Sequence, residues 1–417
     1  MKVEEPGMSG CDKFDIVIVG GGSAGITVAA QFRRRAPQLS VAIIEPGDRH
    51  WYQPGFTLVG SGVFSRAQTE RREEDLIPAG VKWLRAAAAT FDPAADTVAL
   101  EDGRTIGYRS LIVCPGLKLD WDKIEGLGET IGRNGVCSNY LPQYADYTWK
   151  CVQGLSGGNA IFTQPAMPIK CAGAPQKIMY LTADNLRKRG LLSKTNVEFC
   201  LAGDAMFGVA YFVPALLEAV EKYGINVNYK TMLTRVDGDA RKAYFRAPDA
   251  TGNMIDTVKS FDMLHVTPPQ TAPDFIRDSP LASSAGWVDV DGATLQHVTF
   301  KNVFSLGDAA GTTNAKTAAA IRKQAPVVLK NLLAERNGGP LQASYDGYGS
   351  CPLTVSYGKI VLAEFLYGGK VAPSFPLDPR VPRTTMWYLK TKLLPRLYWD
   401  YMLKGSEIDL PHKQLAQ

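Results

Sequence analysis

The hydrophobic pattern at the start of the chain predicts a strand, a turn, a helix and a second strand. Residues 14–19 (FDIVIV) form a short apolar run rich in β-branched residues, which is typical of a buried strand. A glycine-rich turn covers 20–25, a helix is expected over 26–35, and a second apolar run over 41–44 ends at Glu45. This order of elements within about thirty residues is typical of a dinucleotide-binding βαβ unit.

The turn has the pattern Gly-x-Gly-x-x-Gly. Its glycines permit a tight turn, a close approach of the backbone to a pyrophosphate and close packing of the helix. The helix N-terminus that follows offers free N–H groups to phosphate oxygens. The cofactor contacts expected here are Gly20, Gly22, Ser23, Ala24 and Gly25.

Glu45 lies where a dinucleotide-binding unit places an acidic residue against the adenosine ribose. Its carboxylate can accept hydrogen bonds from both ribose hydroxyls, which disfavours a 2′-phosphate. We therefore expect the chain to bind FAD or NAD.

Later patterns predict a second domain of similar type and a return to the first. Strands are expected over 159–163 and 197–202, a helix over 213–223, and returning strands over 263–268 and 302–308. The expected fold is α/β, with two Rossmann-like dinucleotide-binding domains and a C-terminal membrane-interface region. The expected boundaries are 1–127 with 268–340 for the FAD-binding domain, 128–267 for the second domain and 341–417 for the C-terminal region.

The returning strand 302–308 ends in Gly-Asp, which favours FAD. Asp308 is expected to hydrogen-bond a ribityl hydroxyl, and Lys316 and Thr317 should start a helix beside the flavin, where positive charge favours the reduced ring. That helix is expected over 316–330, with Pro326 kinking or ending it. Further FAD contacts are expected from Gln53, Ala88, Pro115 and Gly116.

The second domain lacks a second glycine fingerprint where we expect one. Residues 197–208 read VEFCLAGDAMFG, with Asp204 standing where a glycine would be wanted. A nicotinamide is therefore not expected as the electron donor, and FAD becomes the expected cofactor.

Composition excludes several other classes. The net charge of +5 is mild and does not indicate nucleic acid binding. No apolar run is long enough to cross a bilayer as a helix. Residues 1–15 lack the features of a signal or transit peptide, so we expect a protein that is not imported or a chain without its presequence.

The seven cysteines include no Cys-x-x-Cys pair, so no metal site is expected. Cys171 follows a strand and precedes a helix, with Lys170 and Lys177 nearby, which should lower its thiol pKa. Cys351 is expected on a loop and could meet Cys171 at one face of the flavin. The cysteines expected only to pack are Cys11, Cys114, Cys151 and Cys200.

Eight runs along the chain resemble the sulfide:quinone oxidoreductases, and most closely the branch with the animal mitochondrial enzymes. They cover 50–62, 169–181, 263–269, 285–291, 302–311, 316–321, 345–353 and 397–405. The resemblance implies that Cys171 and Cys351 are a redox pair that oxidises sulfide to a persulfide. It also implies that two electrons pass through FAD to a quinone. The sulfane sulfur would go to an acceptor such as glutathione, sulfite or coenzyme A.

Two departures from the family affect the site. Another branch has a glutamate base after the first cysteine, where Gln176 and Lys177 stand here, so no base is named. That branch also uses a third cysteine, and Cys137 is the candidate for such a sulfur shuttle. The family implies a peripheral, monotopic enzyme of the inner mitochondrial membrane in a eukaryote, or of the cell membrane in a bacterium. Homo-oligomerisation is left open.

Residues 386–404 combine aromatic, aliphatic and basic side chains, with Pro395 expected to split them into two short helices. This composition is typical of an interfacial membrane anchor, although such helices also cover cores or dimer interfaces. The expected membrane contacts are Trp387, Leu394, Tyr398 and Trp399. The expected quinone-pocket aromatics are Tyr357, Phe365 and Phe375.

Two other functions stay open at this point. A flavoprotein sulfide dehydrogenase would use the same chemistry but pass electrons to a cytochrome partner. A regulatory flavoprotein would sense persulfides without turnover.

Overall fold

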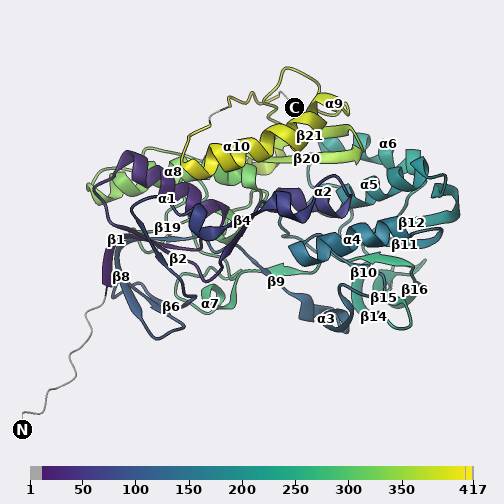
Figure 1. The fold of residues 1–417 in the computed structure, drawn as a ribbon, viewed down its shortest axis with the longest axis horizontal. Helices are drawn as coiled ribbons and strands as arrows, with labels where there is room; N and C mark the ends of the chain where they lie inside the picture. Colours follow the sequence, from purple (N-terminus) through teal and green to yellow (C-terminus); the bar gives the residue numbers. More distant parts are fainter. Residues whose placement is uncertain (1–11, 409, 416–417) are drawn as a thin grey trace, which may run out of the picture.

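The computed structural model describes residues 12–408 and 410–415. Residues 1–11, which include Cys11 and most of the segment considered for targeting signals, lie outside these ranges. Figure 1 shows two α/β halves side by side, with the C-terminal part lying across both. The α/β architecture expected from the sequence is confirmed.

The first sheet has the strand order β5-β2-β1-β8-β7-β6, with β19 also beside β8. Strand β1 is parallel to both of its neighbours, β2 and β8, and β19 is parallel to β8. These strands therefore end at one edge, where Val19 pairs with Ile44 and Val113. The strands are β1 (Asp12–Val19), β2 (Val41–Ile44), β5 (Val81–Leu84), β6 (Ala88–Asp92), β7 (Thr97–Leu100), β8 (Thr105–Val113) and β19 (Val303–Ser305).

Alternation along β1 explains how this sheet is buried on both faces. Ile16 and Ile18 pack with helices α1 (Ser23–Arg35) and α8 (Ala318–Arg336), which lie against each other. Val17 and Val19 face the opposite side and pack with residues that include Ile276 of α7 (Asp274–Arg277). Successive strand side chains point to opposite faces, so this uninterrupted apolar run has no solvated side.

The second sheet has the order β10-β17-β11-β12-β13, with every pairing parallel. One face packs on α5 (Ala174–Lys188) and α6 (Val213–Tyr223). The other face packs on the antiparallel sheet β14-β15-β16. The strands are β10 (Val136–Cys137), β11 (Gly158–Gln164), β12 (Thr195–Leu201), β13 (Asn226–Asn228), β14 (Met232–Asp237), β15 (Lys242–Pro248), β16 (Met254–Ser260) and β17 (Met263–His265).

The chain crosses between the two halves at an antiparallel pair, β9 (Lys118–Leu119) and β18 (Gln270–Thr271). Figure 1 shows β9 between the two halves. The domain boundaries stay a prediction, which this crossing supports. Further strands and α-helices are β3 (Arg49–Trp51), β4 (Glu70–Arg72), α2 (Phe56–Gly60), α3 (Leu127–Thr130) and α4 (Pro142–Gly154).

The C-terminal part begins with the hairpin of β20 (Gly349–Ser356) and β21 (Lys359–Phe365), which packs on α5. A helical run then passes from β21 back to α1, along the top of Figure 1. Its segments are α9 (Thr384–Tyr388), the π-helical turn η9 (Leu389–Leu393), α10 (Leu394–Asp400) and η10 (Met402–Lys404).

Two predicted elements need correction. Pro326 does not end its helix, because α8 begins at Ala318 and continues to Arg336. Pro395 does not separate two helices, because it lies in the first turn of α10, where a missing N–H is tolerated, and η9 joins that helix to α9.

Candidate functional site

The glycine-rich turn has the geometry that its sequence predicts. Gly20 has a φ of +104°, and a Cβ there would lie 2.6 Å from the Cys114 carbonyl oxygen. A Cβ on Gly25 would lie 1.8 Å from the Gly20 oxygen, so this position also requires glycine. A Cβ on Gly22, by contrast, would meet nothing within 4 Å. Helix α1 begins after Gly22 without a side-chain cap, so its first N–H groups face this open side.

Glu45 is held beside the turn by the backbone. Its carboxylate accepts hydrogen bonds from the Gly21 amide at 2.8 Å and from the Gly47 amide at 2.7 Å. Burial raises the pKa of Glu45, and the two amides oppose that rise. The carboxylate therefore has a fixed orientation at the carboxyl end of β2, where a ribose would lie.

Asp308 and Lys316 lie in the segment between β19 and α8. Burial raises the pKa of Asp308, while the ammonium groups of Lys316 and Lys170 oppose that rise. Lys316 Nζ donates to the Asp308 carbonyl at 2.7 Å and lies 4.0 Å from the centre of the Trp287 ring. Burial lowers the pKa of Lys316 to about 8. Thr317 caps α8, since its hydroxyl accepts from the Ala320 amide at 3.2 Å.

The other residues expected to contact FAD are Gln53, Ala88, Pro115 and Gly116. Gln53 Oε1 accepts from Lys170 Nζ at 2.7 Å. Pro115 and Gly116 follow β8, and Pro115 lies against Gly20 at the turn. Ala88 is buried at the start of β6.

Cys171 and Cys351 lie together although 180 positions separate them. Cys171 is on the loop between β11 and α5, and Cys351 is on β20 rather than on the expected loop. Their Sγ atoms are 3.6 Å apart. The loop is fixed by a hydrogen bond of 3.0 Å from the Cys171 amide to the Lys316 carbonyl. The thiol pair is thus joined directly to the segment that carries Asp308 and Lys316.

The two thiols have opposite electrostatic environments. A hydrogen bond from Cys351 and the ammonium of Lys177, whose Nζ is 3.0 Å from Cys171 Sγ, hold the pKa of Cys171 well below its ordinary value. The same hydrogen bond, together with burial, raises the pKa of Cys351. Burial opposes the charge on Lys177, but the sulfurs of Cys171 and Cys351 together outweigh burial and raise the pKa of that ammonium. In the reduced pair, negative charge is therefore favoured on Cys171 over Cys351.

A lysine that the sequence analysis missed belongs to this site. Lys390 lies in the π-helical turn η9 and is 4% exposed. Burial and the nearby Lys177 ammonium lower its pKa to about 7, and the two active-site sulfurs oppose this shift. The sequence placed Lys390 among the basic residues of a membrane anchor, so its burial could not be seen there. π-Helical turns are frequent at functional sites, but sequence does not reveal them.

The structure shows that a second glycine fingerprint should be sought at a different position from the one expected. In a dinucleotide-binding fold the fingerprint follows the first strand of the βαβ unit. That strand is β11, so the relevant turn is 165–173 and not 197–208 as expected. This turn contains Cys171 and has Gly173 as its one glycine. The cysteine therefore occupies the place of a pyrophosphate loop.

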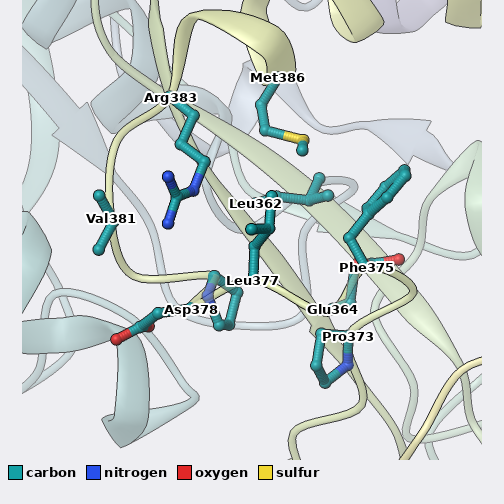
Figure 2. A pocket seen from close by; sticks show the side chains of 10 residues that line it. Leu362, Glu364, Pro373, Phe375, Leu377, Asp378, Val381, Arg383 and Met386 are labelled. Atoms are coloured by element: carbon teal, nitrogen blue, oxygen red, sulfur yellow. The ribbon is translucent and has the colours of Figure 1, made fainter.

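The three aromatics expected to form a quinone pocket do not meet in one pocket. Phe375 lines a pocket with Leu362 of β21 and Met386 of α9, as Figure 2 shows. Phe365 packs instead against Phe207 in the core of the second domain. The Tyr357 hydroxyl donates to the Ser61 carbonyl at 2.6 Å.

The expected membrane contacts Tyr398 and Trp399 are buried, so that prediction is wrong for both. They are 3% and 9% exposed, because this side of α10 packs on the first domain. Tyr398 Oη lies 2.6 Å from Ser23 Oγ and 2.6 Å from His50 Nε2. His50 in turn contacts Glu73. The sequence pattern did not predict this buried network, which connects the C-terminal run to the dinucleotide turn by hydrogen bonds.

Other side chains of the C-terminal run do face solvent. Tyr388 is 64% exposed and Leu393 42%, whereas the expected contacts Trp387 and Leu394 are half-buried. Leu377 and Val381, in the loop before α9, are also exposed. Within residues 12–408 and 410–415, the structure has no helix long and apolar enough to span a bilayer.

Cys137, the candidate sulfur shuttle, is fully buried at the end of β10. Cys151, expected only to pack, is half-buried on α4 and packs against the same hydrophobic core as Cys137. Cys114 and Cys200 are buried among apolar side chains.

Comparison with known proteins agrees with this geometry. The fold and the glycine turn define an α/β oxidoreductase of the pyridine nucleotide-disulphide type. Consistently, residues 14–140 match the family model described as pyridine nucleotide-disulphide oxidoreductase. The structure also resembles that of the sulfide:quinone oxidoreductase of the hyperthermophilic bacterium Aquifex aeolicus, with a TM-score of 0.77 and 19% identity over 95% of this chain and 92% of that one.

Relatives found by sequence identify the family more narrowly than the fold does. The chain is 44% identical to the mitochondrial sulfide:quinone oxidoreductase of Dictyostelium discoideum, over 94% of this chain and 86% of that protein. It is 42% identical to the Mus musculus protein of the same name, over 94% of this chain and 87% of that protein. The chain therefore belongs to the sulfide:quinone oxidoreductase family, and this family implies a flavin cofactor.

Proposed function

We propose that this enzyme oxidises sulfide at the pair Cys171–Cys351 and passes two electrons through bound FAD to a quinone. One observation carries the proposal: two sulfurs 3.6 Å apart, with the Lys177 ammonium beside one of them. The names of the relatives supply the substrates.

The residues around the glycine turn fit FAD. The open side of Gly22 and the uncapped start of α1 suit a pyrophosphate, and the oriented Glu45 carboxylate suits the adenosine ribose. Asp308 would hold the ribityl chain, with Lys316 near the ring. FAD, when bound, supplies the two-electron acceptor that returns the dithiol to a disulfide.

The asymmetry of the pair determines where sulfide attacks. In the oxidised pair the S–S bond would join Cys171 and Cys351. Cys171 is the better leaving group, because a hydrogen bond from Cys351 and the Lys177 ammonium stabilise its thiolate in the reduced pair. Hydrosulfide therefore bonds to Cys351 Sγ and breaks the S–S bond, leaving a Cys351 persulfide and a Cys171 thiolate. An acceptor thiolate, or sulfite, then takes the outer sulfur atom and leaves Cys351 as a thiolate.

Lys390 is the proposed proton carrier of this step. With a pKa of about 7, its Nζ can hold or release a proton near neutral pH. Gln176, which stands near the place of the glutamate base in another branch, does not suit this role. It is fully buried, and its side chain donates to the Met206 carbonyl at 2.8 Å.

The two faces of the β20–β21 hairpin separate sulfide from quinone in this proposal. Cys351 pairs with Ala363, and both face the core of the second domain. Leu362 is the next residue on β21 and points to the opposite side, into the pocket of Figure 2. We assign the quinone to this side because Leu377 and Val381 line the same pocket and are also exposed.

The exposed apolar residues suggest how the enzyme meets a membrane. Tyr388, Leu393, Leu377 and Val381 would lie at the lipid interface, with the basic side chains of Lys392 and Arg396 on the same run. The relatives are named as mitochondrial, so we assign the enzyme to the mitochondrial inner membrane as a monotopic protein. Glutathione, sulfite and coenzyme A are the proposed sulfur acceptors.

A spectroscopic titration tests this function. Sulfide, but not NADH, should bleach the flavin absorbance, and a short-chain quinone should restore it. Bleaching without recovery by quinone would instead favour a sulfide dehydrogenase with a cytochrome partner. Slow bleaching without turnover would favour a persulfide sensor. The variants Cys171→Ser and Cys351→Ser should keep FAD and lose sulfide oxidation, and normal turnover in either would refute the cysteine assignment.

A further inference from the structure

A second carboxyl group, that of Glu73, lies beside Glu45 at the glycine turn. A Cβ added at Gly21 would lie 2.6 Å from Glu73 Oε1 and 2.7 Å from Glu45 Cγ. Glu73 follows β4 at the start of a short 3₁₀ turn, η3 (Glu73–Asp75), and is 2% exposed. Two carboxyl groups from different parts of the first domain therefore share one buried place beside Gly21.

The two oxygens of the Glu73 carboxyl group have different surroundings. Oε2 lies 3.2 Å from His50 Nδ1, and His50 Nε2 lies 2.6 Å from Tyr398 Oη. Oε1 is also buried, yet it has no hydrogen-bond partner in the part of the chain that the structure describes. The imidazole of His50 therefore holds one oxygen, and the unpaired oxygen lies beside Gly21.

The backbone of Glu73 is fixed as well. Its amide donates to the Asp48 carbonyl at 2.9 Å, and its carbonyl accepts from the amides of Leu76 at 2.9 Å and Ile77 at 3.2 Å. Both ends of this side chain are therefore held in place by protein groups. An acceptor that is already oriented loses little conformational entropy when it binds a ligand.

This pair of carboxyl groups calls for hydrogen-bond donors from a ligand. A buried oxygen without a donor costs free energy, which a donor on a ligand would offset. Burial raises the pKa of Glu45, and the neighbouring Glu73 adds to this rise. The 2′- and 3′-hydroxyls of an adenosine ribose are two donors on adjacent carbon atoms, and a dinucleotide-binding fold places this ribose at the carboxyl end of β2.

We propose that Glu73 is a second ribose-binding residue, whose Oε1 accepts a hydrogen bond from one hydroxyl of the FAD adenosine ribose while Glu45 accepts from the other. This role rests on the proposed function, because FAD is the cofactor assigned there. Glu73 follows the β3–β4 hairpin and lies outside the βαβ unit of β1, α1 and β2. The spacing rule that indicates Glu45 therefore does not reach Glu73.

The test reconstitutes the full-length chain, stripped of its flavin, with FAD and with two FAD analogues. One analogue lacks the 2′-hydroxyl of the adenosine ribose and the other lacks the 3′-hydroxyl, and quenching of flavin fluorescence measures each Kd. Glu73→Met removes both carboxyl oxygens and should raise the Kd of FAD by about tenfold or more, the effect of losing a hydrogen bond to a carboxylate. With one of the two analogues the variant and the native protein should bind almost equally, because the hydroxyl that Glu73 binds is already missing.

Glu74→Met is the matched control, because Glu74 is the next residue, is exposed and pairs with Arg72 at 2.7 Å. It should bind all three flavins as the native protein does. The thermal midpoint of each apoprotein shows whether it folds. If Glu73→Met does not fold, Glu73→Gln replaces it, since the amide can keep the contact with His50, and it should show the same pattern with a smaller loss.

Two results would overturn the role of Glu73 alone: an unchanged Kd of FAD in Glu73→Met, or equal weakening of FAD and both analogues, which would indicate a structural role. A native apoprotein that does not bind FAD would refute the cofactor assignment itself, and the role of Glu73 with it.

Discussion

Cys171 shows how a single side chain acquires its chemistry from its neighbours. An isolated thiol is mostly protonated at neutral pH. Here the thiol of Cys351 and the ammonium of Lys177 both stabilise the charged form. The low pKa of Cys171 requires Cys351 of β20 and Lys177 of α5 to lie beside the loop that carries Cys171. It therefore exists only in the folded chain.

The variant Lys177→Met tests this electrostatic effect. Loss of the ammonium should raise the pKa of Cys171, because an opposite charge at contact distance favours the thiolate. The rate of alkylation by iodoacetamide, measured against pH on the reduced enzyme, should therefore have its midpoint at a higher pH. Lys188→Met, on the solvent side of the same helix, should leave the midpoint unchanged. An unchanged midpoint in Lys177→Met would contradict the assignment.

Lys390 gives a prediction for stability against pH. Its pKa in the folded protein is about 7, whereas an unfolded lysine has a pKa of about 10.4. Between these values the unfolded chain binds more protons, so this residue makes the free energy of unfolding rise with pH. Lys390→Met removes that dependence. We expect the variant to be more stable than the native protein at pH 7, with the difference shrinking towards pH 10.

Urea unfolding at a series of pH values measures this difference. Lys392→Met is the control, since Lys392 is an exposed neighbour on the same helical run, and it should match the native protein at every pH. A difference between Lys390→Met and the native protein that stays constant with pH would show that Lys390 is charged throughout.

At the scale of elements, two glycines of the same turn are required for two different reasons. Gly25 is required for packing, because its Cβ would overlap the Gly20 oxygen. Gly22 is required only for the space beside the turn, because its Cβ would meet no protein atom. The sequence motif contains both residues but does not distinguish these reasons.

Alanine at each position should separate them. Gly25→Ala should destabilise the apoprotein by about 1–3 kcal/mol, the range for an overpacked site. Gly22→Ala should leave the thermal midpoint of the apoprotein unchanged and weaken FAD binding. Differential scanning fluorimetry of the apoproteins and the flavin content after reconstitution measure the two effects. Equal flavin binding by Gly22→Ala and the native protein would show that the cofactor does not approach this residue.

The hydrophobic pattern was sufficient to predict those strands and helices that neighbouring residues determine. The runs at 14–19 and 41–44 correspond to β1 and β2, and the helix expected over 213–223 is α6. Pro326 was misjudged, because the packing of α8 against α1 outweighs the loss of one backbone hydrogen bond within a long helix. Propensity is a weak prior when tertiary packing opposes it.

At the scale of the whole molecule, the C-terminal run joins the two halves of the site. Its first part lies over β21 and supplies Lys390 to the thiol pair, and its last part places Tyr398 against Ser23 of the dinucleotide turn. The side facing away carries Tyr388 and Leu393. One helical run therefore carries the proposed membrane surface, a buried lysine in the field of the thiols, and the tyrosine that contacts the dinucleotide turn.

Single charges on this surface should weaken membrane binding. Leu393→Asp should reduce the fraction of enzyme that sediments with anionic lipid vesicles severalfold, because a buried carboxylate at the interface costs free energy. Sulfide bleaching of the flavin should be unchanged. Val258→Asp, at an apolar position on β16 that is more exposed than Leu393, should sediment like the native enzyme. Equal sedimentation of Leu393→Asp would place the membrane surface elsewhere.

The sequence by itself determined what depends on neighbours along the chain: the glycine turn, its acidic partner Glu45 and the α/β order of elements. It also contained the runs by which the family is recognised. Only the tertiary structure decided which distant groups meet and which are buried: the contact of Cys171 with Cys351, and the burial of Lys390 and Tyr398. The physical reason is that periodicity reports one buried face of an element, whereas pKa values and thiol reactivity depend on what another element brings against that face.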